Sequence, residues 1–167
     1  MIDDLLKLNP FSLETKIKNK IFLKQTKYLT IHHFKKCHIY KKIIKNLKFK
    51  VNNTCKIEDF PMLPVRLFKK FELKSISDNQ IIKKLVSSGT TGQNLSKIYL
   101  DKKNSINQSK VLNKIMSNLL GKQRLPMLII DQDPKIRETS VFNARIAAIQ
   151  GFSIFGKDYH YLLDKKN

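Results

Sequence analysis

The chain has 167 residues, which suits one domain or part of a larger one, and 41% of them are hydrophobic, enough to form a core. Its 33 basic and 13 acidic residues give a formal net charge of +20. It has no apolar run near the length of a membrane span and no signal peptide pattern at its start, so we expect a cytoplasmic protein without a membrane span.

The positive charge favours an acidic partner such as nucleic acid, but the type of basic residue argues against specific recognition. Bidentate contacts to bases and phosphates favour arginine. The chain has only four arginines, and its lysines are spread along the sequence: the arginines are Arg66, Arg124, Arg137 and Arg145. We therefore expect salt-sensitive, non-specific binding to polyanions and no specific nucleic acid.

The first fifty residues predict a helical region. A short helix is expected from about Asp3 to Leu8, and Ser12 is expected to cap a long helix that runs into the thirties. Apolar residues recur in that helix at helical spacing, namely Leu13, Ile17, Ile21, Tyr28 and Ile31. Another helix is expected over 40–47, with a turn at Asn52-Asn53.

The cysteine and histidine residues of this region do not predict a metal site. Cys37 and Cys55 lie 18 residues apart, and neither belongs to a CxxC pair, which indicates two ordinary thiols. His32, His33 and His38 lie near Cys37, but their spacing does not suit a structural zinc site. We interpret them as polar and packing residues at a helix end.

After residue 50, predicted strands alternate with helices, which favours an α/β fold. Pro64 is expected to open a short helix. Strands are expected over 71–76, 81–86, 97–100, 125–131 and 152–155. A helix with Leu112, Ile115, Met116 and Leu119 on one face should end at Gly121, and a helix over 141–150 should end at Gly151.

Two kinds of charged residue in this half are candidates for chemistry. Asp131 and Asp133 are candidate ligands or bases, but the simpler interpretation is that Asp131 ends a strand and Asp133 begins a turn before Pro134. Arg66 and Arg145 are candidate contacts for a carboxylate or phosphate, although ion pairs are the simpler interpretation.

The stretch most informative about chemistry runs from Ser87 to Lys97, SSGTTGQNLSK, after an apolar strand. Its glycines let the backbone approach a ligand closely, and successive backbone N–H groups in such a loop form an anion-binding hollow. The hydroxyl groups add donors without charge. The pattern matches neither GxxxxGK[ST] nor GxGxxG, and by composition alone it fits a phosphate-binding loop or a polar linker between strands.

SSGTTG resembles the phosphate-binding signature of adenylate-forming enzymes, the superfamily that includes acyl-CoA synthetases and luciferases. Most members continue with one residue and then Pro-Lys, whereas here the proline is absent and the lysine is displaced to Lys97. Neighbouring blocks narrow the resemblance to LuxE-type acyl-protein synthetases, whose order and spacing they keep: FPMLPVRLFK (60–69), LVSSGTTGQ (85–93), SKIYLD (96–101), RLPMLIID (124–131) and GFSIFG (151–156).

The resemblance implies an ATP phosphate-binding site with Lys97 as a nearby cation, made by Ser87, Ser88, Gly89, Thr90, Thr91 and Gly92. It implies that ATP, with Mg²⁺, activates a fatty acid as acyl-AMP. The acyl group then passes to a cysteine of the enzyme and on to an acyl-reductase partner. In the resemblance, that cysteine and the adenine- and ribose-binding motifs lie outside this chain, so we expect an N-terminal part that requires a C-terminal half.

The resemblance also predicts the organisation of the chain. Residues 1–50 form an N-terminal helical region, and residues 51–167 form part of an adenylate-forming domain, a layered mixed sheet with helices. Two other functions stay open. One is a related ligase that makes acyl-CoA or activates an acid for surface-polysaccharide assembly, and the other is a non-catalytic basic module that binds nucleic acid.

Overall fold

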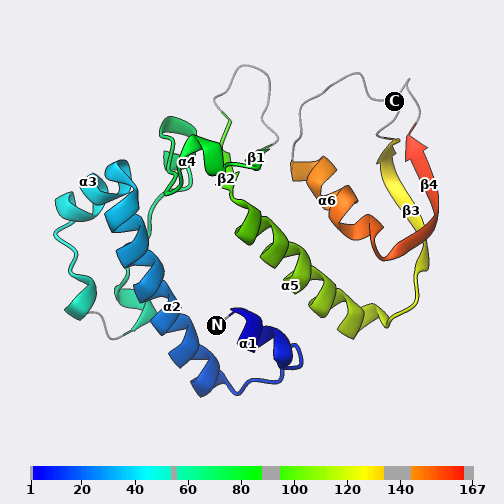
Figure 1. The fold of residues 1–167 in the computed structure, drawn as a ribbon, viewed down its shortest axis with the longest axis horizontal. Helices are drawn as coiled ribbons and strands as arrows, with labels where there is room; N and C mark the ends of the chain where they lie inside the picture. Colours follow the sequence, from blue (N-terminus) through cyan, green and yellow to red (C-terminus); the bar gives the residue numbers. More distant parts are fainter. Residues whose placement is uncertain (1, 54–55, 88–94, 134–143, 164–167) are drawn as a thin grey trace.

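The computed structural model describes residues 2–53, 56–87, 95–133 and 144–163, which form helices and two small sheets (Figure 1). The predicted α/β class is confirmed. The described strands lie in two separate sheets of two strands each, β1 with β2 and β3 with β4. Across these ranges, none of the helices combines the length and apolar character needed to cross a membrane.

The N-terminal helices lie where the sequence predicts them, as α1 (Ile2–Lys7), α2 (Thr15–Lys36) and α3 (His38–Asn46). The prediction that Ser12 caps the long helix is wrong, because α2 begins at Thr15 and Glu14 precedes it. The Ser12 hydroxyl instead donates to the carbonyl of Asn9 at 2.7 Å, which stabilises the turn between α1 and α2.

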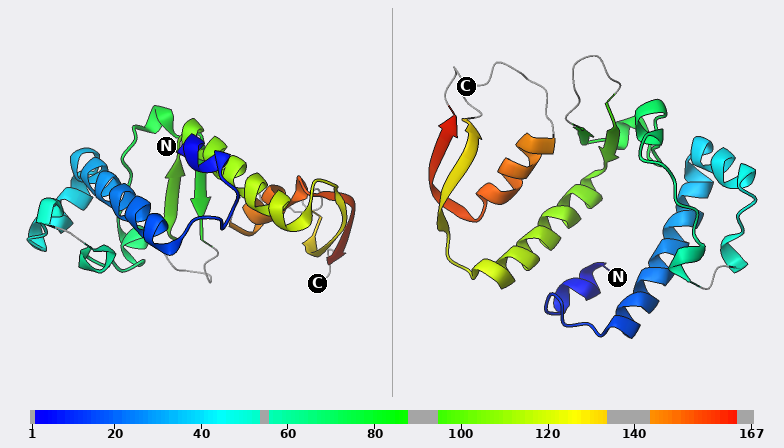
Figure 2. Two further views of the ribbon diagram at one scale, coloured as in Figure 1. Left: turned by 90° about the horizontal axis from the view of Figure 1, so that it is seen from below. Right: turned by 180° about the vertical axis from the view of Figure 1, so that it is seen from behind.

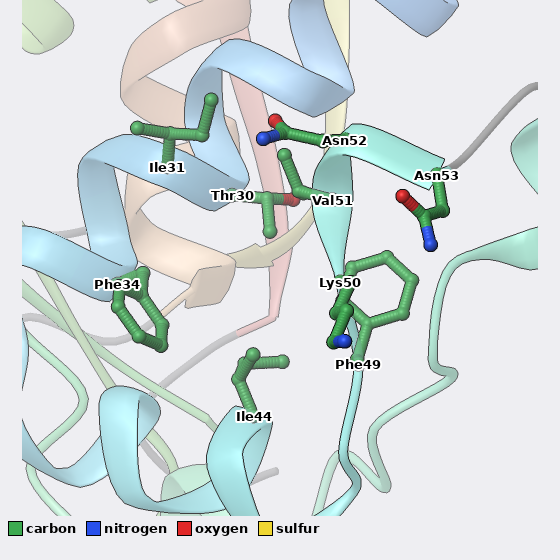
Figure 3. Close-up of a pocket in the computed structure, with 9 residues that line it drawn as sticks. All are labelled: Thr30, Ile31, Phe34, Ile44, Phe49, Lys50, Val51, Asn52 and Asn53. Atoms are coloured by element: carbon green, nitrogen blue, oxygen red, sulfur yellow. The ribbon is translucent and has the colours of Figure 1, made fainter.

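Helices α2 and α3 pack together and form a small core of their own. Thr30, Cys37 and Ile44 are buried between them, and the short 3-10 helix η1 (Val51–Asn53) lies against α2. Figure 3 shows the hollow of about 340 Å³ that these elements leave, with Phe34, Ile44 and other apolar side chains around it. In Figure 1 the helices that line this hollow, α2 and α3, lie away from the β3–β4 sheet.

The segment that follows forms turns. The 3-10 helix η2 (Ile57–Asp59) leads to α4 (Leu67–Lys70), which begins three residues after Pro64, so the prediction that Pro64 opens this helix is wrong. The strand predicted over 71–76 is also wrong, because backbone N–H groups bond two residues back, from Leu73 to Phe71 and from Lys74 to Glu72, each at 3.1 Å. These bonds bend the chain.

The predicted strands over 81–86 and 97–100 are confirmed as β1 (Lys83–Val86) and β2 (Lys97–Leu100), after the 3-10 helix η3 (Asp78–Gln80). The strands pair antiparallel. The predicted helix after them is α5 (Lys102–Leu120), and the Asp101 carboxylate caps it by accepting from the N–H of Asn104 at 2.7 Å. Gly121 ends it with a φ of 81°, a conformation that favours glycine.

The C-terminal part is a strand–helix–strand unit of β3 (Leu125–Gln132), α6 (Ala144–Ser153) and β4 (Gly156–Leu163), with parallel strands. Two sequence predictions fail here. Gly151 lies inside α6 and does not end it, and the residues predicted as a strand over 152–155 finish the helix and its turn. A Cβ atom at Gly151 would lie 3.3 Å from the Leu112 side chain of α5, so glycine permits the close approach of α6 and α5.

Strand β3 is buried on one face only. Ile129 and Asp131 point to the covered face, whereas Leu128 and Ile130 on the opposite face are 64% and 78% exposed. The strand predicted over 125–131 is therefore confirmed, but only one of its two faces is buried.

Candidate functional site

Most of the predicted phosphate loop lies outside the residues that the structure describes. This applies to Ser88, Gly89, Thr90, Thr91 and Gly92. The structure does describe both ends of the loop, Ser87 at the end of β1 and Ser96 before β2, together with Lys97. These residues show how the loop is held.

Two hydrogen bonds between Ser87 and Ser96 close the base of the loop, which we call the neck. The N–H of Ser87 donates to the carbonyl of Ser96 at 3.1 Å, and the N–H of Ser96 donates to the Ser87 hydroxyl oxygen at 3.1 Å. The hydroxyl of Ser87 therefore has a structural role at the neck. These bonds hold the two ends of the loop together at the end of the hairpin.

One face of the hairpin carries a group of charged and aromatic side chains. Because side chains alternate along a strand, the opposed residues Lys84 and Tyr99 share a face with the opposed residues Val86 and Lys97. The Lys84 Nζ lies 5.8 Å from the centre of the Tyr99 ring. Lys97 is half-buried and lies one residue beyond the neck, so its position suits the cation that the sequence predicts beside the loop.

The segment between α4 and η3 supplies an acidic partner to this face. The Tyr99 hydroxyl donates to Glu72 Oε1 at 2.8 Å, and Lys74 Nζ lies 3.5 Å from Glu72 Oε2 while also pairing with Asp78. The pKa of the Glu72 carboxyl is lowered, first by the Tyr99 hydrogen bond and then by Lys74. Burial, followed by the bond to Glu72, raises the pKa of Tyr99. The hairpin is thereby tied to the segment that follows α4.

Helix α6 joins the other sheet to this hairpin. It touches both β4 and β1, and in Figures 1 and 2 its first turn lies beside β1. Arg145 in that turn forms an ion pair with Asp131 near the end of β3, with Nε 3.1 Å from Oδ2. The prediction of an ion pair for Arg145 is confirmed.

His33 and Cys37, near the end of α2, make polar and packing contacts. His33 Nδ1 lies 2.7 Å from the Ser75 hydroxyl oxygen, which links α2 to the segment after α4. Burial, followed by the charge of His32, lowers the pKa of His33. Cys37 is a buried free thiol, and Cys55 lies outside the described residues. Across the part of the chain that the structure describes, no three His, Cys, Asp or Glu side chains are placed to hold a metal ion.

Sequence reasoning missed the bond between Glu72 and Tyr99, because 27 residues separate them and the segment 71–76 was expected to be a strand. It did identify Asp131 and Arg145 separately, but nothing in their spacing of 14 residues predicts that they meet. A signal was available in the charge of Asp131, since an aspartate inside an apolar strand requires a partner.

Comparison with known proteins assigns the family. The family model of the acyl-protein synthetases, LuxE, matches residues 1–167. No curated protein sequence gives a significant match. The match extends over the helical region, the hairpin with its neck and the strand–helix–strand unit. Members of this family are ligases that act as acyl-protein synthetases. The chain therefore belongs to the LuxE family of acyl-protein synthetases.

Proposed function

We propose that this chain supplies the phosphate-binding part of a ligase that activates a fatty acid with ATP. The observation that carries the proposal is the neck, where Ser87 and Ser96 close a loop rich in glycine and hydroxyl groups beside Lys97. The family model supports the wider assignment to acyl-protein synthetases. The neck holds the two ends of the loop together, and the lysine supplies a positive charge near the place where a nucleotide phosphate would bind.

The proposed reaction has two steps. In the first, a carboxylate oxygen of the acid attacks the α-phosphorus of ATP. The bond from that phosphorus to the oxygen that joins it to the β-phosphate breaks, and pyrophosphate leaves. In the second, the thiolate of an acceptor cysteine attacks the acyl carbon, and AMP leaves with the bonding electron pair. Cys37 is buried, so we do not assign it as that acceptor.

The loop acts in the first step by placing the triphosphate and by offsetting negative charge as pyrophosphate departs. Backbone N–H groups between Gly89 and Gly92 bind phosphate oxygens, because glycine permits the close approach that a side chain would block. The ammonium group of Lys97 adds a positive charge at the base of the loop. Mg²⁺ accompanies the nucleotide and is held in part by its phosphates.

Affinity labelling tests the nucleotide site in the chain itself. An acyl-phosphate derivative of ATP transfers its acyl group to lysines that lie beside the bound phosphates. We expect ATP-protected labelling at Lys97, and we expect Gly89→Val to remove that protection while Gln108→Val, at an exposed position of α5, keeps it. The exposed Lys110 on α5 serves as the internal reference for non-specific labelling.

Two results of the labelling experiment would contradict the proposed nucleotide site. If ATP protects no lysine near the neck, or if Gly89→Val leaves the protection at Lys97 unchanged, the loop does not bind the nucleotide phosphates. Labelling that is uniform over the lysines and falls with salt alone would show only the attraction of a polyanion to a strongly basic chain.

A further inference from the structure

The positive charge of this chain is concentrated in its N-terminal helices. Residues 15–53 contain twelve lysines and no aspartate or glutamate, so they carry +12 of the formal net charge of +20. Lysines also occur in the rest of the chain, but acidic residues offset many of them there. We call residues 15–53, which include α2, α3 and η1, the basic helical region. A segment of this length without acidic residues has a positive potential that attracts a negatively charged partner.

Helix α2 packs against the rest of this region through one side only. Thr30 is buried, and Figure 3 shows Thr30 and Phe34 of α2 around the same hollow as Ile44 of α3. The periodicity of the helix places another set of residues on the sides of α2 that face away from this hollow. We call this set the outer side of α2, and it consists of Ile17, Lys18, Phe22, Lys24, Tyr28, Leu29, Lys35 and Lys36.

The outer side of α2 presents apolar and basic side chains together. All of its residues are exposed, and the two aromatic residues are exposed most among its apolar members, Phe22 at 57% and Tyr28 at 61%. Single exposed apolar residues are ordinary, but several on one helix surface indicate a site of interaction. The apolar stems of lysines can lie along an apolar layer while their ammonium groups stay at its charged surface.

This combination favours a lipid surface over other anionic partners. Every Lys or Arg position of the basic helical region is a lysine, whereas arginine suits the bidentate contacts by which proteins recognise nucleic acids. A second copy of this chain would bring the same positive charge to the contact. Helices that lie in a membrane interface combine lysines, which are attracted to anionic headgroups, with phenylalanine, leucine or tyrosine, which enter the boundary between headgroups and acyl chains.

We propose that the outer side of α2 docks this chain on an anionic lipid surface. The helix lies in the plane of the interface, with its lysines at the headgroup phosphates and with Phe22 and Leu29 in the edge of the apolar layer. This inference goes beyond the proposed function and requires no nucleotide. Fatty acids partition into lipid layers because burial of their chains is favourable, so docking also brings a ligase of the proposed kind to its substrate.

A tryptophan reporter tests where α2 lies, because the chain has no tryptophan of its own. Phe22→Trp places the reporter on the outer side, and Ile106→Trp places it at an exposed position of α5 as a matched control. Vesicles of phosphatidylcholine with phosphatidylglycerol provide the anionic surface. We expect the emission of Phe22→Trp to move to shorter wavelength on these vesicles and to be quenched by lipids brominated on their acyl chains, and the emission of Ile106→Trp to show neither change.

Two results of the reporter experiment would overturn the proposal. One is a chain that does not bind the anionic vesicles at physiological salt. The other is a bound chain in which Phe22→Trp keeps the emission of a tryptophan in water and escapes the brominated lipids.

Paired lysine substitutions measure the electrostatic part of docking by co-sedimentation with the vesicles. Lys18→Gln with Lys36→Gln removes two charges from the outer side, and Lys103→Gln with Lys122→Gln removes the same charge from exposed positions outside the basic helical region. A lysine at an anionic surface strengthens binding by about fivefold, and this effect is lost beyond about 10 Å. We expect the α2 pair to weaken binding by about tenfold or more and the control pair by less than about threefold. Equal losses would show attraction to net charge alone and would overturn the docking surface.

Paired apolar substitutions separate a lipid surface from a nucleic acid. Phe22→Gln with Leu29→Gln keeps the charge, so we expect vesicle binding to weaken by about fivefold or more and binding of duplex DNA to change by less than about twofold. Ile106→Gln with Leu119→Gln, at exposed positions of α5, should leave both unchanged.

The apolar pair also defines two results against the proposal. Unchanged vesicle binding in Phe22→Gln with Leu29→Gln would overturn it, and an equal loss of DNA binding would assign the outer side of α2 to nucleic acid instead. Circular dichroism checks the fold of each variant. If a paired variant unfolds, the quenching of Phe22→Trp decides.

Discussion

Replacement of Ser87 with alanine is expected to open the neck of the loop without unfolding the chain. The Ser87 hydroxyl oxygen accepts from the N–H of Ser96 at 3.1 Å, and alanine removes this acceptor. The second bond of the neck, from the N–H of Ser87 to the carbonyl of Ser96, uses backbone atoms and survives the substitution. Ser96 takes part through its backbone in both bonds, so Ser96→Ala is a matched control.

The size of the effect follows from the single bond that is lost. A hydrogen bond of this kind contributes about 0.5–1.5 kcal/mol net. Because 1.4 kcal/mol corresponds to a factor of ten in an equilibrium constant, the open state of the neck should become roughly two to ten times more populated. The free energy of unfolding of the whole chain should fall by no more than about 1.5 kcal/mol.

Amide hydrogen exchange measures this population, since the Ser96 N–H exchanges when the neck opens. We expect its exchange rate in Ser87→Ala to rise by roughly two- to tenfold, with the rate in Ser96→Ala close to that of the original chain. Binding of tripolyphosphate should weaken in the same variant. Equal exchange rates in the two variants would refute the assignment of the Ser87 hydroxyl to the neck. A large rise in the exchange rate with unchanged phosphate binding would show that the neck does not contribute to binding.

The remaining predictions concern the reaction, the charge and the pH dependence. In an enzyme completed by the C-terminal half, Gly89→Val and Thr91→Val should each abolish acid-dependent ATP–pyrophosphate exchange, and wild-type rates in both would contradict the loop assignment. Supplied with ATP, Mg²⁺ and radiolabelled myristate, the chain alone should form no acyl-AMP above the Gly89→Val background; label on Cys37 would contradict this. DNA binding should be weak, insensitive to sequence and lost as salt rises, and a selective complex at physiological salt would oppose it. Burial lowers the pKa of His33 below its usual value of 6.5, so the contribution of the neutral side chain to stability is present above pH 6.5 and is lost as the pH falls below that value. The melting temperature should therefore fall less steeply with pH in His33→Gln, and an equally steep fall would disprove this.

Local sequence patterns were sufficient for the helices and for the hairpin. The apolar face of helix α5 and its end are predicted, because apolar periodicity and the glycine at Gly121, with a φ of 81°, are local signals. The strands on both sides of the loop are predicted for the same reason. Gly151 misled the prediction, because glycine ends many helices but here permits the approach of α6 to Leu112 on α5, a contact between segments far apart in sequence.

The sequence alone determined that a glycine- and hydroxyl-rich loop follows a strand, that the family is that of the acyl-protein synthetases, and that Lys97 lies near the loop. Only the tertiary structure decided which side chains meet around it. The bond between Tyr99 and Glu72, the neck bond of the Ser87 hydroxyl and the pair of Asp131 with Arg145 all depend on how the elements pack. Hydrogen bonds and ion pairs act over a few ångströms in space, and the order of residues along the chain does not fix those distances.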